Sequence, residues 1–308
     1  MLYRVFDGHC DTPVELWLQE KQLRSSDLAV SLDKAAGLGG YAQFFAFCTA
    51  WIKTRMPHTE HFSRALDYFL AQLRKNEDRI TLCRTAPEAE AAMQAGKCAA
   101  FLAIEGAEAV REDEGLLELA YEAGVRMVSL VWNLPNGLSG SCQTGEGLTE
   151  KGKRFFRRAQ KLGMLVDVSH LSEKGFWDMA ELAEKPIVAS HSDSFAVCPH
   201  PRNLTDAQIS AIVHNEGVIG LNLCPAFLGL GRNMDAVLAH IDHFLCMDAR
   251  ENLCIGTDFD GIESLPEGIT GVESMEELYE QMLAHRFSEA LVQDIFFNNL
   301  RRFLGEAL

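Results

Sequence analysis

Short apolar runs rich in β-branched residues alternate with stretches of helical periodicity along most of the chain. The apolar runs predict strands at residues 3–9, 42–48, 99–105, 126–132, 164–170, 187–191, 218–223 and 253–258. The stretches between them predict helices that include residues 61–75, 115–123, 150–162, 172–183, 206–215 and 234–247. Capping residues such as Ser172, and Thr205 followed by Gln208, mark helix starts. The pattern therefore predicts about eight strand–helix units in succession.

A strand–helix unit repeated about eight times is typical of a doubly wound open sheet or of a (β/α)8 barrel. The strand ends favour the barrel, because nearly every apolar run closes with a polar residue. These residues are His9, Asp11, Glu105, Asn133, His170, His191, Asn222 and Asp258. In a barrel such ends converge on one mouth, whereas in an open sheet they would be spread along an edge. The chain also lacks a glycine-rich phosphate-binding turn after its first strand. We therefore predict an α/β fold, a single (β/α)8 TIM barrel domain that spans residues 1–308.

The composition excludes two classes of partner. The 308 residues carry a net charge of −16 and no basic block larger than a pair such as Arg157 and Arg158, so no face suits nucleic acid. No apolar run approaches the roughly 18 residues of a membrane span, and neither end has the pattern of a secretion or lipid-anchor signal. The nine cysteines form no C-x-x-C pair and mostly lie in apolar runs, which is typical of buried, reduced thiols. We expect a cytoplasmic protein that binds neither nucleic acid nor membrane.

Two candidate metal ligands flank Cys10 near the N-terminus. Residues i and i+2 of a strand project to the same side, so His9 and Asp11 can bind one ion while Cys10 faces away. Taken alone, this spacing is a weak signal. Glu105 follows six consecutive apolar residues, and a carboxylate there is costly to bury unless it is paired or binds a metal. A glutamate that simply emerges at the end of its strand explains Glu105 equally well.

Two later strands end in Ser-His, at His170 and His191, and the last strand ends at Asp258. A single terminal histidine is usually a structural residue, but two on successive strands, together with the ligands above, indicate a metal site. Asp258 is placed to face the mouth, whereas Asp260 is expected to cap a loop. Three histidines and three carboxylates suit Zn²⁺ and, less selectively, Mn²⁺, Co²⁺ or Fe²⁺. Because six ligands exceed what one catalytic zinc takes, we predict two metals bridged by a carboxylate.

The motifs that contain these residues resemble those of the membrane (renal) dipeptidase family, zinc-dependent dipeptidases of the amidohydrolase-like barrel group. The matching motifs are Asp7-Gly8-His9-Cys10-Asp11-Thr12-Pro13, Ile104-Glu105-Gly106, Asp167-Val168-Ser169-His170, Ala189-Ser190-His191-Ser192, Pro201-Arg202-Asn203-Leu204-Thr205-Asp206 and Gly256-Thr257-Asp258-Phe259-Asp260-Gly261. They occur in the family's order between residues 7 and 261 and cover most of the chain. Together the motifs are highly specific, although no single one would be.

The resemblance implies two zinc ions per chain. One zinc ion would be held by His9, Asp11 and Glu105, and the other by Glu105, His170 and His191. Glu105 would bridge the two ions. The reasoning from residue types gives the same ligands, but it does not divide them between two ions.

The resemblance further implies that Asp258 is the general acid and base and that Arg202 binds the carboxylate of the substrate. The chain departs from the family at the end of the fourth predicted strand, where Trp132 stands in place of a histidine thought to contact the substrate carbonyl oxygen. An indole N–H donates one hydrogen bond but cannot ionise. Trp132 therefore either substitutes as a neutral donor and pocket wall or marks a change of substrate or rate. Barrels of this family are commonly dimers, so the chain is also a candidate homodimer.

We expect a metal-dependent dipeptidase that acts on dipeptides with a free C-terminal carboxylate. One alternative is another binuclear metallohydrolase on the same barrel, acting on a cyclic amide, a lactone or a phosphoester. Against it, residues 126–133 contain no lysine that could serve as a carboxylated bridging ligand. The other alternative is a degenerate barrel that binds metal or peptide without turnover. The intact Asp258 and the full ligand set argue against that reading.

Overall fold

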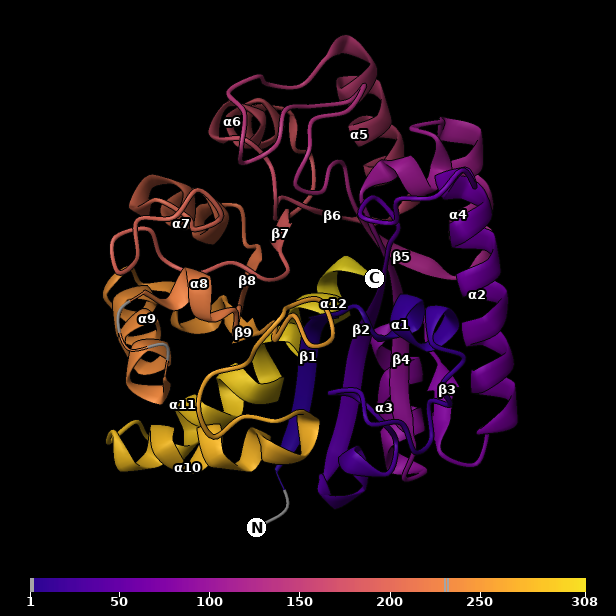
Figure 1. The fold of residues 1–308 in the computed structure, drawn as a ribbon. Coiled ribbons are helices and arrows are strands. Elements are labelled where there is room, and N and C mark those ends of the chain that lie inside the picture. The colour runs from indigo at the N-terminus through magenta and orange to yellow at the C-terminus, as the bar shows by residue number, and fades with distance from the viewer. Residues whose placement is uncertain (1–2, 230, 232) are drawn as a thin grey trace.

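The computed structural model describes residues 3–229, 231 and 233–308. Eight parallel strands close into a barrel that helices surround (Figure 1). The strands are β1 (Arg4–Cys10), β2 (Gly40–Cys48), β4 (Cys98–Glu105), β5 (Val125–Ser129), β6 (Leu165–Asp167), β7 (Val188–Ala189), β8 (Val218–Leu221) and β9 (Leu253–Ile255). The ring closes where β2 pairs with β4, from Ala42 opposite Ala99 to Cys48 opposite Glu105. The (β/α)8 TIM barrel predicted from the sequence is confirmed.

A further strand, β3 (Ile80–Leu82), lies outside the ring and is not predicted by the sequence pattern. β3 pairs with the first half of β4, and β5 pairs with the second half from Leu102 onward. Because β4 is longer than β5, the first residues of β4 would otherwise have unpaired backbone N–H and C=O groups on the edge that faces β5. β3 satisfies them with three residues, too few to show a periodic pattern.

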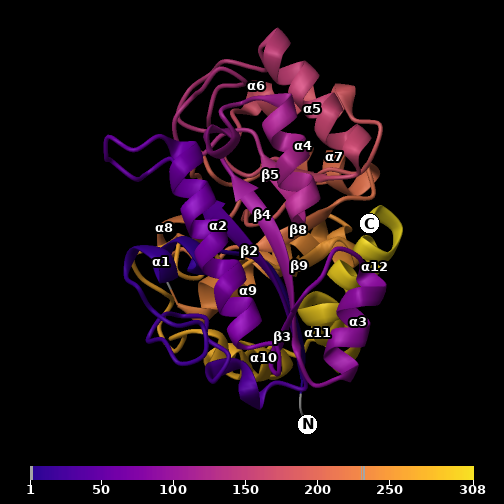
Figure 2. The ribbon, with the colours of Figure 1, turned by 90° about the vertical axis from the view of Figure 1, so that its right-hand side faces the viewer.

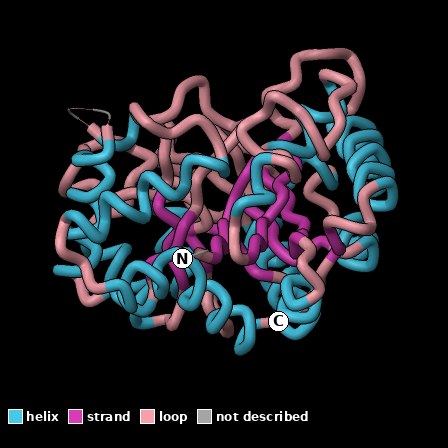
Figure 3. The backbone as a smooth tube through the Cα atoms, turned by 90° about the horizontal axis from the view of Figure 1, so that it is seen from below, coloured by secondary structure: helices cyan, strands magenta, loops and turns pink. Residues whose placement is uncertain are grey.

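The helices form an outer layer that encloses the strands, as the view from below shows (Figure 3). The α-helices are α1 (Thr12–Leu18), α2 (His58–Lys75), α3 (Ala86–Gln94), α4 (Glu114–Ala123), α5 (Glu150–Leu162), α6 (Glu173–Leu182), α7 (Asp206–His214), α8 (Pro225–Leu228), α9 (Met234–Cys246), α10 (Met275–Ala284), α11 (Glu289–Gln293) and α12 (Asn299–Ala307). Short 3-10 segments are η1 (Lys34–Gly37), η2 (Ala107–Val110), η3 (Ala249–Glu251) and η4 (Val272–Ser274), and η5 (Asp294–Asn298) is π-helical. The six helices predicted from periodicity are all present. No helix of the described residues is long and apolar enough to span a membrane.

The predicted caps fix where α6 and α7 begin. The hydroxyl of Ser172 accepts the N–H of Gly175, which starts α6. Before α7, the side chains of Thr205 and Gln208 each accept a hydrogen bond from the backbone N–H of the other, forming a capping box. These two helix starts border one of the cavities described below.

Aromatic side chains fill the amino-terminal half of the barrel. The rings of Phe6, Phe44 and Phe101 stack with centroids 5.0 to 6.2 Å apart. Phe297 of η5 packs on Phe6 at 6.1 Å, and α12 continues this cover and lies beside α3 (Figure 2). Because side chains close this end, a solvent-accessible site lies at the carboxyl ends of the strands.

A bulge in β1 changes which side chains of this strand point into the barrel. Asp7 pairs with Gln43 and Cys10 with Phe45, so three residue steps of β1 match two of β2. Phe6 therefore points into the barrel, while Cys10 packs on the helix side, as the spacing of the motif predicts.

The backbone that follows β7 enters the centre of the barrel. The carbonyl oxygen of Ser190 lies so close to the neighbouring strands that a Cβ at Gly220 or Gly256 would come within 1.9 or 2.0 Å of it. Only glycine permits this approach of backbone to backbone. His191, the next residue, thereby reaches the middle of the barrel mouth.

Candidate active site

The residues predicted to carry the chemistry lie buried at the carboxyl end of the barrel. They are His9, Asp11, Glu105, His170, His191 and Asp258. The predicted strands that contain the last three are too long, because β6, β7 and β9 stop two or three residues before them. His170 and Asp258 lie instead in the first loop turn, with φ angles of 72° and 62°. Such left-handed backbone costs on the order of 1–3 kcal/mol and persists where the surrounding structure enforces it, as at active sites.

One triad of side chains surrounds the Nε2 atom of His9. This atom lies 3.4 Å from Oδ2 of Asp11 and 3.6 Å from Oε2 of Glu105. Both His9 Nε2 and Asp11 Oδ1 are buried, and neither has a hydrogen-bond partner among the described residues. Because buried polar atoms are almost always satisfied, the two atoms mark a place for a ligand.

The other carboxylate oxygen of Glu105 faces a second triad. Oε1 lies 2.7 Å from Nε2 of His170 and 3.4 Å from Nε2 of His191. Within each triad the candidate ligand atoms lie within 4.8 Å of one another, which is close enough to hold a metal ion. The triads share Glu105, and this is the division of residues that the sequence resemblance implies.

Hydrogen bonds on the far side of two imidazoles fix which nitrogen carries the proton. Nδ1 of His170 lies 2.8 Å from Oδ1 of Asn133, an oxygen that can only accept. Nδ1 of His191 lies 2.7 Å from the hydroxyl of Ser190, which donates its own proton to Asp167 at 2.6 Å. Both Nδ1 atoms are therefore donors, and both Nε2 atoms carry lone pairs. These lone pairs face each other across 2.9 Å, an arrangement that a cation stabilises. The donor set therefore fits metal ions.

Burial and neighbouring charge set the ionisation of the triads. Burial, reinforced by Arg202, lowers the pKa of His170 to about 4, and burial lowers the pKa of His191 well below its usual value. Burial opposes ionisation of Glu105, but the facing His9 and His170 hold the pKa of Glu105 well below its usual range. In the second triad, the neutral imidazoles and the ionised carboxylate have the protonation states that metal ligands require. In the first triad, burial opposes protonation of His9, but the carboxylates of Glu105 and Asp11 raise the pKa of His9 well above its usual value, so a metal ion bound there would displace this proton.

Asp258 lies next to the first triad. Its Oδ1 is 4.0 Å from Nε2 of His9, and its Oδ2 accepts a hydrogen bond from Asn222 at 3.0 Å. Burial raises the pKa of Asp258 to about 6, and the nearby His9 and Arg202 limit the rise. Such a carboxyl group can both take up and release a proton near neutral pH. Asp260 instead accepts backbone hydrogen bonds from a neighbouring loop, the structural role expected for it.

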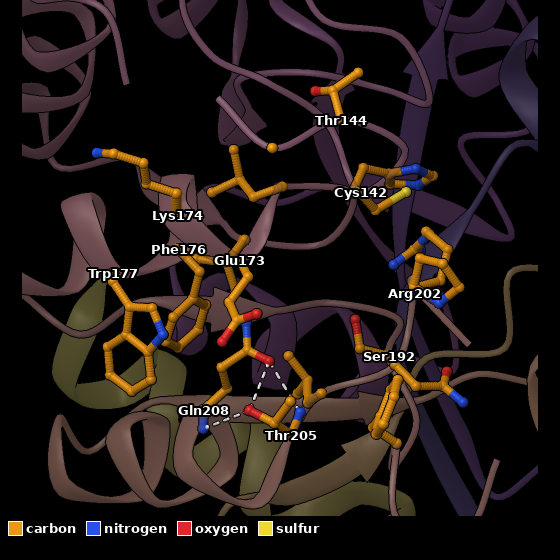
Figure 4. A pocket seen from close by; sticks show the side chains of 18 residues that line it. Cys142, Thr144, Glu173, Lys174, Phe176, Trp177, Ser192, Arg202, Thr205 and Gln208 are labelled. Carbon is orange, nitrogen blue, oxygen red and sulfur yellow. Dashed lines mark hydrogen bonds between the residues drawn. The ribbon is translucent and has the colours of Figure 1, made fainter. Parts of the chain in front are cut away.

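Two cavities open at this end of the barrel, and His170 lines both. The first, which we call the mouth cavity, measures about 770 Å³ and is lined by Glu105, Asp258 and Trp132. The second, which we call the α6–α7 cavity, measures about 660 Å³ and contains Arg202 (Figure 4). The structure thus places the two predicted substrate-binding residues, Trp132 and Arg202, in different cavities.

Arg202 lies in the wall between the two cavities. Its side chain is buried, one terminal nitrogen donates to the carbonyl of His191 at 3.1 Å, and Nε has no partner among the described residues. The guanidinium carbon lies 5.4 Å from the ring centroid of Phe227, which lines the mouth cavity. The cation is therefore near the triads and also borders the α6–α7 cavity.

Several residues that hydrogen-bond to the candidate ligands and to Asp258 have no role predicted from the sequence. Asn133 and Asn222 are recognised there as strand-end residues without a role, and the structure hydrogen-bonds them to His170 and Asp258. Ser190 belongs to a matching motif, but nothing in the motif indicates that its hydroxyl orients an imidazole. The α6–α7 cavity gives no signal in the sequence, because its lining comes from separate segments.

Comparison with known proteins gives a family. Residues 2–308 match the family described as membrane dipeptidase, peptidase family M19. The chain is 34% identical over 240 residues to an uncharacterised protein in the pqqA 5′ region of Klebsiella pneumoniae, with 73% of this chain and 88% of that protein covered. It is 30% identical over 237 residues to dipeptidase tcpJ of Claviceps purpurea, with 74% of this chain and 56% of that protein covered.

Solved structures of the same family superpose on the whole chain. A metallopeptidase from Rhodobacter sphaeroides, bound to a phosphinate mimic of the dipeptide L-Ala-D-Ala, gives a TM-score of 0.90 at 29% identity, with 100% of both chains covered. Dipeptidase AC, a metallopeptidase of family M19, gives a TM-score of 0.91 at 30% identity, with 100% of this chain and 99% of that one covered. Members of the family use a metal cofactor and act on small dipeptides. The chain belongs to the membrane dipeptidase family, peptidase family M19, and is a metallodipeptidase.

Proposed function

We propose that the chain hydrolyses dipeptides with a free C-terminal carboxylate and that it uses two zinc ions bridged by Glu105. The observation that carries this proposal is the pair of triads that share Glu105, with the lone pairs of His170 and His191 directed at each other. Imidazole and carboxylate ligands are typical of catalytic zinc. When bound, zinc supplies Lewis acidity, which makes a water molecule more acidic and polarises a carbonyl group.

Asp258 is the proposed general base and general acid. Because Asn222 holds Oδ2, the other oxygen, Oδ1, is the atom available for proton exchange. Oδ1 takes a proton from the attacking water and returns one to the leaving amine. A pKa of about 6 suits both steps near neutral pH, and such catalysis contributes roughly 10²–10⁴-fold to the rate.

Arg202 is the proposed partner of the substrate's C-terminal carboxylate. Its buried guanidinium has an unpaired N–H, and a planar guanidinium can bind a carboxylate with two parallel hydrogen bonds. Only the last residue of a peptide carries this carboxylate, so Arg202 directs cleavage to the bond before that residue. The Rhodobacter sphaeroides relative binds a phosphinate mimic of L-Ala-D-Ala, which supports a dipeptide substrate.

Trp132 is proposed to form a wall of the mouth cavity and to act as a neutral hydrogen-bond donor. Its ring centroid lies 6.3 Å from that of His170, and the side chain lines the mouth cavity. The indole N–H can donate to a substrate oxygen, but unlike the histidine of relatives it cannot ionise.

Zinc loading followed by a dipeptide assay tests the proposal. We expect two zinc ions per chain by elemental analysis and turnover that a chelator abolishes. Asp258→Asn should lower kcat by about 100-fold or more, as expected for a general acid–base residue, while it retains both zinc ions. A dipeptide amide, which lacks the carboxylate, should be a poor substrate.

Three results would contradict parts of the proposal. A zinc content of one ion per chain would exclude the bridged pair. Turnover by Asp258→Asn within about tenfold of the unaltered chain would exclude the acid–base role, since such a role contributes more. Equal hydrolysis of a dipeptide and its amide would exclude recognition of the carboxylate by Arg202.

A further inference from the structure

The α6–α7 cavity has an apolar outer part that the proposed chemistry does not use. Trp177 of α6 and Phe195 of the loop before α7 line it, although their side chains are 39% and 40% exposed. Large apolar side chains with this exposure that share one cavity indicate a binding surface. In Figure 4, Trp177 and Arg202 lie at opposite ends of the cavity.

The inner end of this cavity carries a buried cation. Arg202 is only 5% exposed, and its Nε has no hydrogen-bond partner among the described residues. A buried cation is costly unless an anion or several acceptors satisfy it. The α6–α7 cavity is therefore suited to a ligand with a negative group at one end and an apolar group at the other.

The mouth cavity has the opposite electrostatic character. Apart from the proposed zinc ligands Asp11 and Glu105, its acidic lining residues are Glu15, Asp258, Asp260 and Glu263, and no lysine or arginine is among the described residues that line it. A dipeptide has an ammonium group at its first residue and a carboxylate at its second. The two cavities together therefore favour one orientation, with the ammonium in the mouth cavity and the carboxylate at Arg202.

We propose that the α6–α7 cavity binds the side chain of the substrate's C-terminal residue and that Trp177 and Phe195 select large apolar side chains there. This inference rests on the proposed function, because it takes the carboxylate to be bound by Arg202. The carboxylate and the side chain of one residue branch from the same carbon atom, so a carboxylate at Arg202 brings the side chain to this cavity. His170 lines both cavities, and the scissile bond would lie at this shared wall.

Charge in the outer part of the cavity refines the expected specificity. Lys174 lies 2.9 Å from both carboxylate oxygens of Asp178, so its charge is already paired. Glu173 also lines the cavity and is exposed. A C-terminal Asp or Glu would face this carboxylate without a free cation, whereas Leu or Phe would contact the aromatic rings. Apolar C-terminal residues are therefore the preferred class.

A substrate series with one N-terminal residue tests the inference. Ala-Gly, Ala-Leu, Ala-Phe and Ala-Glu, with the C-terminal residue in both chiralities where it has one, would be compared for kcat and KM. The unaltered enzyme should prefer Leu and Phe. Trp177→Ala and Phe195→Ala should each lower kcat/KM for Ala-Phe by roughly tenfold or more, mainly through KM, because a large apolar contact is lost. Both variants should lose much less kcat/KM on Ala-Gly, whose C-terminal residue has no side chain to bind there, and Trp177→Phe should retain most of the preference.

A matched control and three outcomes separate the explanations. Leu119→Ala removes an apolar side chain of α4 that is 59% exposed and outside both cavities, so it should alter no substrate. Equal losses on Ala-Gly and Ala-Phe would indicate a structural role and overturn the inference. Hydrolysis without preference for the C-terminal residue would overturn it and leave the proposed function intact. A zinc-loaded enzyme that hydrolyses no dipeptide would overturn both.

Discussion

His240 on α9 is wholly buried and holds the loop that leads to Arg202. Its Nδ1 accepts the backbone N–H of Ser194 at 3.1 Å, and its Nε2 lies 3.3 Å from the carbonyl oxygen of Leu228. These contacts require the neutral ring, because a proton on Nδ1 would face the N–H of Ser194. Burial lowers the pKa of His240 from 6.5 to about 4. Acid should therefore destabilise the fold through this residue.

The size of the effect follows from the two pKa values. A histidine with a lowered pKa in the folded state contributes its full stability above pH 6.5, where both states are neutral. Below that pH the unfolded chain takes up the proton first. Each pKa unit corresponds to about 1.4 kcal/mol, so the loss is about 2 kcal/mol at pH 5 and about 3.4 kcal/mol well below pH 4.

Urea unfolding at pH 7.5 and pH 5 measures this contribution. The variant His240→Gln keeps an acceptor and a donor but cannot be protonated. We expect the free energy of unfolding of the unaltered chain to fall about 2 kcal/mol further than that of the variant between these pH values. A chelator in all samples removes any effect of metal release, and His214→Gln, a change at an exposed residue, serves as control. Curves for the unaltered chain and His240→Gln that fall in parallel would refute the reasoning.

Three further substitutions test separate features of the structure. Asn133→Ala removes the acceptor that holds the proton on Nδ1 of His170, so metal affinity measured by chelator competition should fall about 10- to 100-fold. Gly256→Ala places a Cβ 2.0 Å from the carbonyl oxygen of Ser190, and the free energy of unfolding should fall by at least about 1–3 kcal/mol. Phe297→Ala opens the closed end of the barrel, where the ring is 2% exposed, and should cost about 3–5 kcal/mol in denaturant unfolding with little change in kcat.

The parts of the fold that the sequence predicts are those with local signals. Helices α6 and α7 have apolar periodicity and a cap at Ser172 or Thr205, and both appear where they are predicted. β3 has no such signal, because its three residues are too few to show a period. It forms by pairing with the first half of β4, which β5 leaves unpaired. The apolar side chains of η5 and α12 pack against residues from the start of the chain, such as Phe6. This contact depends on closure of the barrel, so no local pattern predicts it.

The candidate site likewise has features that the sequence predicts and features that it does not. The triads are predictable because barrel topology brings polar residues at strand ends to one mouth, whatever the loops do. The positions of the protons on His170 and His191 are not predictable, since they depend on Asn133, which follows β5, and on Ser190, whose own proton is donated to Asp167 of β6. The separation of Trp132 from Arg202 depends on loop packing, and a motif cannot encode it.

The closed floor of the barrel also bears on how the chain is made. β1 is synthesised first, yet its Asp7 pairs with Ile255 of β9, which is synthesised much later. Phe6 likewise packs on Phe297, near the end of the chain. Until residues 294–307 leave the ribosome, the nascent barrel carries an open aromatic layer, the kind of surface that aggregates or binds chaperones. Substitutions in the last two helical segments should therefore change the yield of folded enzyme, while each molecule that completes folding retains its full turnover.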